Sequence, residues 1–199
     1  MQSRLILVPL VASILVAAAS MVSAQVAYEA REGKVPLAVG LGVSDFSLDW
    51  GTSDPRQEGI TLWVDWRISH VPRVLHGLGI EMEGRDLNLN NAPGLGIRHD
   101  TLLGGPIYQW QHPKKIWPYA KYVLGIGSID FKNTANPSYQ HDTRAVFAPA
   151  VGVDVLAVNR FSVRAEYEYQ FWHQIFGPRD LNPQGFTIGA VYDFQRSTR

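Results

Sequence analysis

Hydrophobic and polar residues alternate strictly over residues 162–172, in the segment SVRAEYEYQFW. Every second side chain, from Val163 to Phe171, is apolar or aromatic, and the side chains between them are polar. A period of two is typical of a β-strand, whose successive side chains point to opposite faces of the sheet. One face of this predicted strand is therefore apolar, and the other carries Arg164, Glu166 and Glu168.

Pieces of similar length recur along the chain and are separated by Gly, Pro and Asn, whereas helical periodicity is hard to find. The connections between them alternate in length, and the long ones are rich in Asn, Asp, Pro and Gly. Outer-membrane barrels have short turns on one rim and long loops on the other. The pattern predicts an all-β fold, an eight-stranded antiparallel up-and-down transmembrane β-barrel, with strands at residues 35–46, 59–69, 77–86, 96–110, 117–131, 144–158, 160–172 and 185–195.

The predicted strands share one face of large apolar side chains and a second face that mixes charge with glycine and alanine. In a soluble sheet the charged face meets water, but in a membrane barrel the apolar face meets lipid and the charged face meets the lumen. Small residues weaken an exposed sheet, whereas in a narrow barrel they make room for long Arg and Glu side chains. We therefore predict a structural polar network in the lumen formed by Asp65, Arg67, Glu81, Glu83, Arg85, Arg98, Asp100, Lys121, Arg144, Asp154, Arg164, Glu166 and Glu168.

The predicted lumen charges are nearly balanced, with seven acidic and six basic side chains. Buried charges must be paired, and this balance permits pairing. Strand adjacency predicts Arg144 and Asp154 as the first partners of the charges on the 160–172 strand. Aromatic residues lie near both ends of the predicted strands, as in the interfacial belts of spanning barrels: Trp66, Tyr108, Trp110, Trp117, Tyr119, Tyr192 and Phe194 at one rim, and Phe46, Trp50, Phe131, Tyr139, Phe171 and Trp172 at the other.

The first residues of the chain have the features of a secretory signal peptide. A basic start at Arg4 precedes an apolar run over residues 5–22, and small residues end at Ala24. We predict a cleaved signal peptide at residues 1–24 and one barrel domain at residues 25–199. Without Arg4, the 18 basic residues of the chain become 17 against 18 acidic ones, so no nucleic-acid partner is expected.

The composition offers little for a cofactor. The chain has no cysteine, so an exported domain would be stabilised without disulfides. The six histidines show no spacing typical of a metal-ligand pair. We therefore expect no metal and no cofactor.

The last predicted strand contains TIGAVYDF, in which Gly189 follows Thr187 by two residues, and two aromatic residues, Tyr192 and Phe194, occupy alternate positions near the end. This segment resembles the C-terminal signal that the barrel assembly machinery reads, although QRSTR follows the final aromatic residue. The chain resembles the small outer-membrane β-barrel family that includes the OmpA membrane domain and OmpX. The resemblance implies a monomer in the outer membrane of a bacterium with two membranes, in contact with lipid and lipopolysaccharide. It also implies a structural or surface-interaction role without an open pore or enzymatic activity.

Two alternatives remain at this point. A soluble periplasmic lipocalin-like barrel would place the apolar face inward, around a small apolar ligand. The lipid A deacylase type is similar in size and uses a His closely followed by Ser on the outer wall, with a Glu on a neighbouring strand. His173 has no nearby Ser, Ser69–His70 lies at a short turn, and Ser138 and His141 lie in a predicted loop, so no catalytic residue is expected.

The apolar outer face predicts that urea-washed outer membranes retain the protein. Its mobility in SDS gels is expected to shift on boiling, because a closed barrel resists SDS until it is heated. Recovery as a soluble periplasmic protein without detergent would instead support the lipocalin-like alternative.

Overall fold

The computed structural model describes residues 35–49, 56–68, 72–89, 96–110, 115–131, 140–177 and 179–195. Almost all of them lie in strands. The strands are β1 (Leu37–Ser47), β2 (Arg56–Arg67), β3 (Leu78–Leu87), β4 (Ile97–Gln109), β5 (Ile116–Phe131), β6 (His141–Val158), β7 (Phe161–Tyr169), β8 (Phe171–Ile175), β9 (Arg179–Leu181) and β10 (Gln184–Asp193). The predicted signal peptide, Trp50, Ser69, His70, His112, Ser138 and Tyr139 lie outside the described residues.

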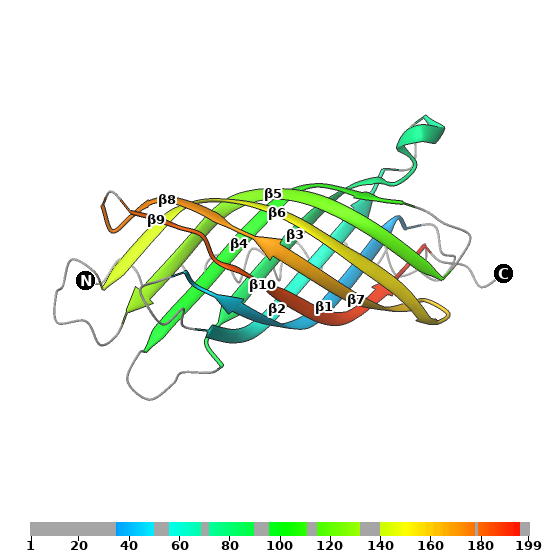
Figure 1. Cartoon of the computed structure of the whole chain (residues 1–199). Helices are drawn as coiled ribbons and strands as arrows, with labels where there is room; N and C mark the ends of the chain where they lie inside the picture. Colours follow the sequence, from blue (N-terminus) through cyan, green and yellow to red (C-terminus); the bar gives the residue numbers. More distant parts are fainter. Residues whose placement is uncertain are drawn as a thin grey trace, which may run out of the picture.

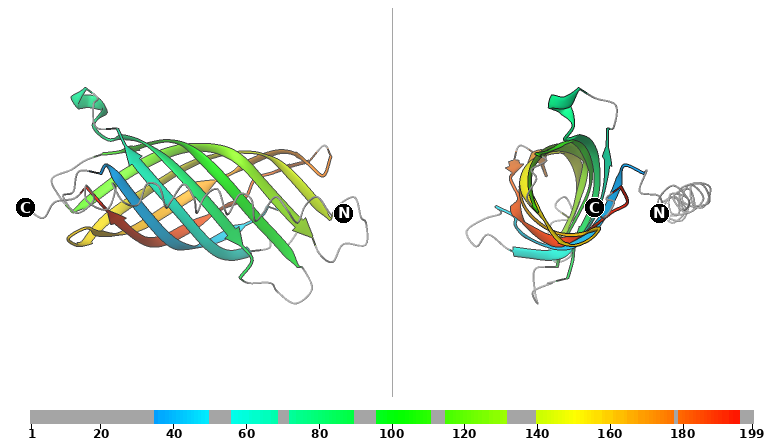
Figure 2. Two further views of the ribbon diagram at one scale, coloured as in Figure 1. Left: turned by 180° about the vertical axis from the view of Figure 1, so that it is seen from behind. Right: turned by 90° about the vertical axis from the view of Figure 1, so that its right-hand side faces the viewer.

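The strands form a closed antiparallel barrel (Figures 1 and 2). Each of β1 to β6 pairs with the next strand, β6 pairs with both β7 and β8, and β10 pairs with both β7 and β1. Because β8 continues β7 and β9 leads into β10, the ten segments make eight barrel strands. The predicted eight-stranded up-and-down barrel is confirmed. Closure leaves no sheet edge, as the lack of water in a bilayer requires.

The seventh and eighth barrel strands are each interrupted near the long-loop rim. The Gln170 backbone N–H donates to the Pro183 carbonyl at 2.7 Å, where the ladder between β7 and β10 ends. Proline has no N–H to return a bond, so regular pairing breaks there. Gln174 and Phe176 adopt φ of 56° and 49°, which turns the chain between β8 and β9.

A short 3-10 helix, η1 (Arg73–Leu75), follows β2 at the short-turn rim (Figure 1). The Tyr108 hydroxyl donates to the Val74 carbonyl at 2.9 Å and ties η1 to β4. Among the described residues, no helix is long and apolar enough to cross a membrane.

The outer wall is apolar over most of its height. Large aliphatic side chains from all eight barrel strands project outward, and along β7 Val163 and Tyr167 lie on this face while Arg164 lies inside. Such a continuous exposed apolar surface suits lipid and not water. Its central members are 46–63% exposed: Leu41, Val43, Ile60, Leu62, Ile80, Met82, Leu102, Leu124, Ile126, Val151, Val163 and Ile188.

Part of the predicted aromatic belts is wrong. Tyr119, Phe46 and Trp172 lie inside the barrel with at most 1% of their surface exposed. Phe131 packs against the interior apolar cluster as well. Each occupies the inward parity of its strand, so nearness to a rim did not determine which face it takes. Trp66 and Trp110 do lie outward, 51% and 50% exposed.

Charge at mid-height on the outer wall is expected to destabilise the protein. Leu62→Arg should cost about 2–4 kcal/mol of unfolding free energy, and Glu58→Arg, outward on the same strand but nearer the rim, about 0–1 kcal/mol. Urea titration in lipid vesicles measures both. Equal costs would contradict the lipid-facing assignment of Leu62.

Candidate functional site

The centre of the barrel interior is organised around Lys121 of β5. Its Nζ lies 2.5 Å from Glu81 Oε1 and 2.5 Å from Glu83 Oε2, both on β3. It also lies 3.0 Å from Glu166 Oε2 and 3.8 Å from Glu168 Oε2, both on β7. All five side chains are buried, so this ammonium is a shared counter-ion for four carboxylates from opposite walls.

A second cluster surrounds Arg164, which lies two residues before Glu166 on β7 and shares its inward face. Its guanidinium lies 2.8 Å from Asp154 Oδ1 on β6, 2.7 Å from Asp65 Oδ2 on β2 and 2.7 Å from Glu81 Oε2. The same group lies over the rings of Tyr119 and Trp63, 4.5 Å and 5.1 Å from their centroids. Ion pairs and cation–π contacts therefore fill the lumen across its whole width.

Arg85 of β3 extends the network toward the long-loop rim. It makes two hydrogen bonds to Glu168, at 2.6 Å and 3.3 Å, and lies over the Phe46 ring at 4.4 Å. The side chain of Gln170 then donates to Glu168 at 2.7 Å and accepts from Trp172 Nε1 at 2.8 Å. The polar network ends at this tryptophan.

Beyond Trp172 the interior becomes mostly apolar. His99 meets the Trp172 ring edge-on, with 4.9 Å between the ring centroids. The long-loop half is closed by a buried apolar cluster: Leu48, Ile97, Leu103, Val123, Ile129, Val146, Ala148, Trp172, Ile175 and Leu181. A mostly apolar layer, which also contains the buried side chains of His99 and Gln57, and a charged layer thus lie in series along the barrel axis.

Several inward glycines make room for aromatic rings, whereas the sequence predicted room for Arg and Glu. A Cβ at Gly40 would lie 2.2 Å from a Trp63 ring atom, and one at Gly152 would lie 2.4 Å from the Tyr119 ring. A Cβ at Gly127 would similarly meet Trp172 at 2.2 Å. The long charged chains reach past these rings to partners on the opposite wall.

Three predicted lumen residues lie elsewhere. Arg98 and Asp100 are outward on β4, with side chains 42% and 34% exposed, and pair with each other at 2.8 Å. The segment GIRHDTLLGG carries polar residues at both parities, so alternation alone assigned its faces wrongly. Arg144 lies at the rim and pairs with Asp142 at 3.1 Å, while Glu166 pairs with Lys121 and with Tyr119 at 2.6 Å.

The predicted charge balance is also wrong. Asp193, which was not counted in the predicted network, is buried and forms an ion pair with Arg67 at 2.8 Å. The described interior holds seven buried carboxylates against three buried cations, with Arg67 at the short-turn rim as a fourth: the acids are Asp65, Glu81, Glu83, Asp154, Glu166, Glu168 and Asp193, and the buried cations are Arg85, Lys121 and Arg164. Each buried cation therefore forms ion pairs with more than one carboxylate.

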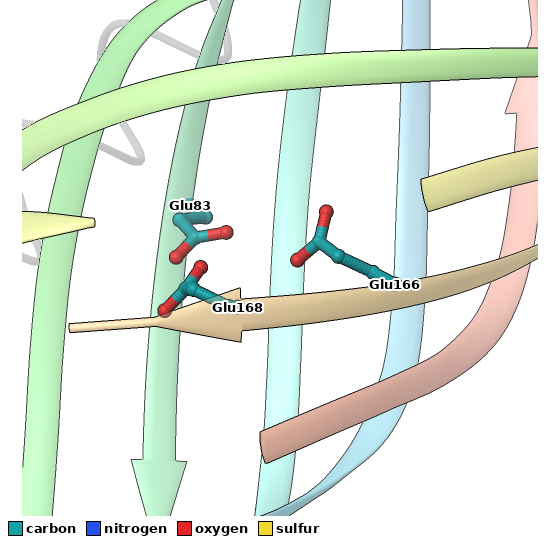
Figure 3. A group of neighbouring side chains, drawn as sticks. All are labelled: Glu83, Glu166 and Glu168. Carbon is teal, nitrogen blue, oxygen red and sulfur yellow. The ribbon is translucent and has the colours of Figure 1, made fainter. Parts of the chain in front are cut away.

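Figure 3 shows Glu83, Glu166 and Glu168 with their carboxylates close together. Each offers an oxygen, and these oxygens lie within 4.8 Å of one another, which is compatible with holding a metal ion. The ammonium of Lys121 already lies 2.5 Å from Glu83 and 3.0 Å from Glu166. The chain thus supplies its own cation, and the cluster fits a structural role.

The predicted assembly-signal residues divide between the two faces of β10. Thr187 is inward and lies 2.7 Å from the Ser44 hydroxyl, and a Cβ at Gly189 would meet Trp63. Tyr192 packs edge-on against Phe194 and Phe161, with centroid distances of 4.8 Å and 5.0 Å. These rings cluster at the short-turn rim.

A closed barrel with an apolar outer wall and paired charges inside has the features of an outer-membrane β-barrel. Sequence comparison supports this assignment. The model of the outer membrane protein beta-barrel domain family matches residues 14–194, so the chain belongs to that family. Among solved structures, Neisserial surface protein A matches with a TM-score of 0.61 and 13% identity, over 79% of this chain and 97% of that one. Ail of Yersinia pestis matches with a TM-score of 0.53 and 13% identity, over 78% and 96%. At these identities the likeness shows the fold alone. No curated protein matches.

Removing the shared counter-ion is expected to destabilise the barrel strongly. Lys121→Met leaves four buried carboxylates without their ammonium and should cost about 3–5 kcal/mol of unfolding free energy. Adding Glu83→Gln should recover part of that loss, since one fewer charge is left unmatched. Urea titration in detergent measures the cycle.

Arg56→Met is the matched control, because it removes an ion pair with Asp45 on the outer wall where both side chains are exposed. It should change stability little. A Lys121→Met variant as stable as this control would contradict the central role of Lys121.

Proposed function

We propose that this protein is a closed outer-membrane barrel whose role is carried by its outer wall and its long-loop rim, and not by passage through the lumen. The observation that supports this most is the pair of layers in series. The Lys121 network spans the centre, and the apolar cluster around Trp172 fills the long-loop half. An ion would have to separate buried ion pairs and then cross a mostly apolar layer.

The width of the barrel supports the same conclusion. Eight strands enclose a space that side chains alone can fill. Here aromatic rings do so, since Trp63 and Tyr119 lie over glycines of nearby strands on the same side of the barrel. The interior is therefore a core, comparable with that of a soluble protein, and its role is to stabilise the wall.

The location carries further proposals. Family membership implies the outer membrane, and we propose export through the signal peptide at residues 1–24. The Tyr192–Phe194 pair next to Gly189 supports reading by the barrel assembly machinery. Lipid and lipopolysaccharide would then contact the apolar wall, and the chain would act as a monomer in a structural or surface-interaction role.

Reconstitution tests the absence of a pore. In planar bilayers or liposome-swelling assays, the protein should give no stable conductance and no solute uptake, while a general porin prepared in the same way gives both. Stable unitary currents from the folded, heat-modifiable protein would refute the closed-barrel proposal.

A further inference from the structure

The outer wall carries a chain of hydrogen bonds that the lumen network does not involve. His141, the first residue of β6, bonds through Nδ1 to Asp130 Oδ1 on β5. Its other ring nitrogen, Nε2, lies 3.2 Å from Thr143 Oγ1, two residues along β6 on the same outward face. The Thr143 hydroxyl lies 3.5 Å from Ser128 Oγ.

This order of groups is that of a nucleophile, a general base and an orienting carboxylate. A carboxylate on Nδ1 fixes the tautomer that leaves Nε2 free to accept a proton, and a hydroxyl at Nε2 is the group to be activated. Geometry and roles, not sequence position, define such a triad. From it we infer that Asp130, His141 and Thr143 form an acyl-hydrolase site on the outer wall.

The height of the site on the wall indicates its substrate. Ser128 pairs in register with Thr143, and the next outward pair toward mid-height is Ile126 with Ala145. Leu124 and Ile126 are 53% and 58% exposed and face the hydrocarbon, as does Leu102 across β4. An acyl chain lying along these residues would bring its carbonyl to the hydroxyl of Thr143.

The charged residues around the site fit the headgroup level. Arg98 is paired in register with Asp130, and Asp86 and Asp100 lie beside it on the same outer surface. Charges on the lipid side cost little only near the interface. The boundary between apolar and charged side chains therefore passes just below Thr143, which is where the ester bonds of a membrane lipid lie. Long loops mark this rim as the external one, so the substrate is an O-acyl ester of an outer-leaflet lipid.

The reaction follows from the three groups. The Thr143 hydroxyl oxygen attacks the acyl carbon while His141 Nε2 takes its proton and Asp130 stabilises the imidazolium. The new Oγ–acyl bond forms, the ester C–O bond breaks, and the lipid alcohol leaves with the proton from Nε2. A water molecule, deprotonated by the same nitrogen, then hydrolyses the acyl-threonine, which releases the fatty acid and restores the hydroxyl. Ser128 is a positioning residue for the Thr143 hydroxyl.

This inference goes beyond the proposed closed barrel and differs from the expectation that the chain has no catalytic residue. The two proposals fail separately, because conductance tests the lumen and fatty-acid release tests the outer wall.

The test uses the purified full chain in mixed micelles with dipalmitoyl phosphatidylcholine, its ether-linked analogue, or purified lipopolysaccharide. Fatty acid should be released from an ester lipid and not from the ether analogue, and the two ester arms tell phospholipid from lipopolysaccharide as the source. Thr143→Val and His141→Asn should each lower release by roughly a hundredfold or more, and Thr143→Ser should retain it. Heat-modifiability in SDS gels shows that each variant is folded.

The chain offers a matched control. His173 and Asp180 form a second outward His–Asp pair, at 3.4 Å, between β8 and β9. The Gln174 backbone N–H donates to Asp180 at 3.1 Å. No serine or threonine occurs in residues 169–186. His173→Asn should therefore leave turnover unchanged.

A fluorophosphonate probe gives a readout that does not depend on the natural lipid. It should modify Thr143 in the wild type and not in His141→Asn, as peptide mass spectrometry would show. Absence of fatty-acid release from both esters, or equal release by folded His141→Asn, would overturn the inference. Loss in Ser128→Ala with retention in Thr143→Val would overturn the assignment of Thr143.

Discussion

Eight strands enclose too little space for bulk water, and this constraint determines what every inward-facing residue of the protein does. Charges inside such a barrel lose their hydration and must be stabilised by one another. Lys121 meets this requirement for four glutamates at once, and Arg164 and Arg85 meet it for the rest of the central network. Aromatic rings set against glycine occupy the remaining space. The interior is thus a solid support for the wall around it.

Because the lumen is narrow, groups that interact with other molecules must lie on the outside of the barrel. With the lumen filled, the surfaces left to meet other molecules are the lipid-facing wall and the rims. Side chains on that wall differ with depth: aliphatic residues such as Leu124 lie at mid-height, and the polar pair of Asp130 and His141 lies near the long-loop rim. A reacting group on this wall is therefore placed by its depth in the membrane.

Alternation in the sequence predicted the closed eight-stranded barrel and, along β7, the face of each residue, because the contrast between RxExE and the aromatic residues is strong. It failed along β4, where Arg98 and Asp100 compete with His99 and Thr101 for the polar parity. Strand adjacency correctly predicted Asp154 as an ion-pair partner of Arg164, because this contact joins neighbouring strands of the sheet. Strand adjacency did not predict Lys121 as the partner of Glu166, because contacts across the lumen depend on the barrel diameter and strand tilt, which the sequence pattern does not specify.

The cluster on the outer wall was missed for a different reason. β6 begins at His141, three residues before its predicted start, so His141 and Thr143 belong to a strand and share its outward face. Treated as loop residues, they had no fixed neighbour, and the expected pattern has serine, not threonine, closely following histidine. Cross-strand register with β5 supplied both Asp130 and Ser128.

The ion pairs of the interior join β3, β5 and β7, strands that are not neighbours in the sheet. A one-residue shift in the register of any of these strands would turn its charged side chains toward lipid and its apolar side chains inward. Glu81 and Glu83 meet Lys121 within three consecutive strands, but the contacts of Glu166 with Lys121 and of Arg164 with Glu81 form only when the last strands complete the ring. A misaligned ring therefore contains unmatched charge in a medium without water. Electrostatic matching across the lumen therefore adds a free-energy penalty to strand alignments other than the native one.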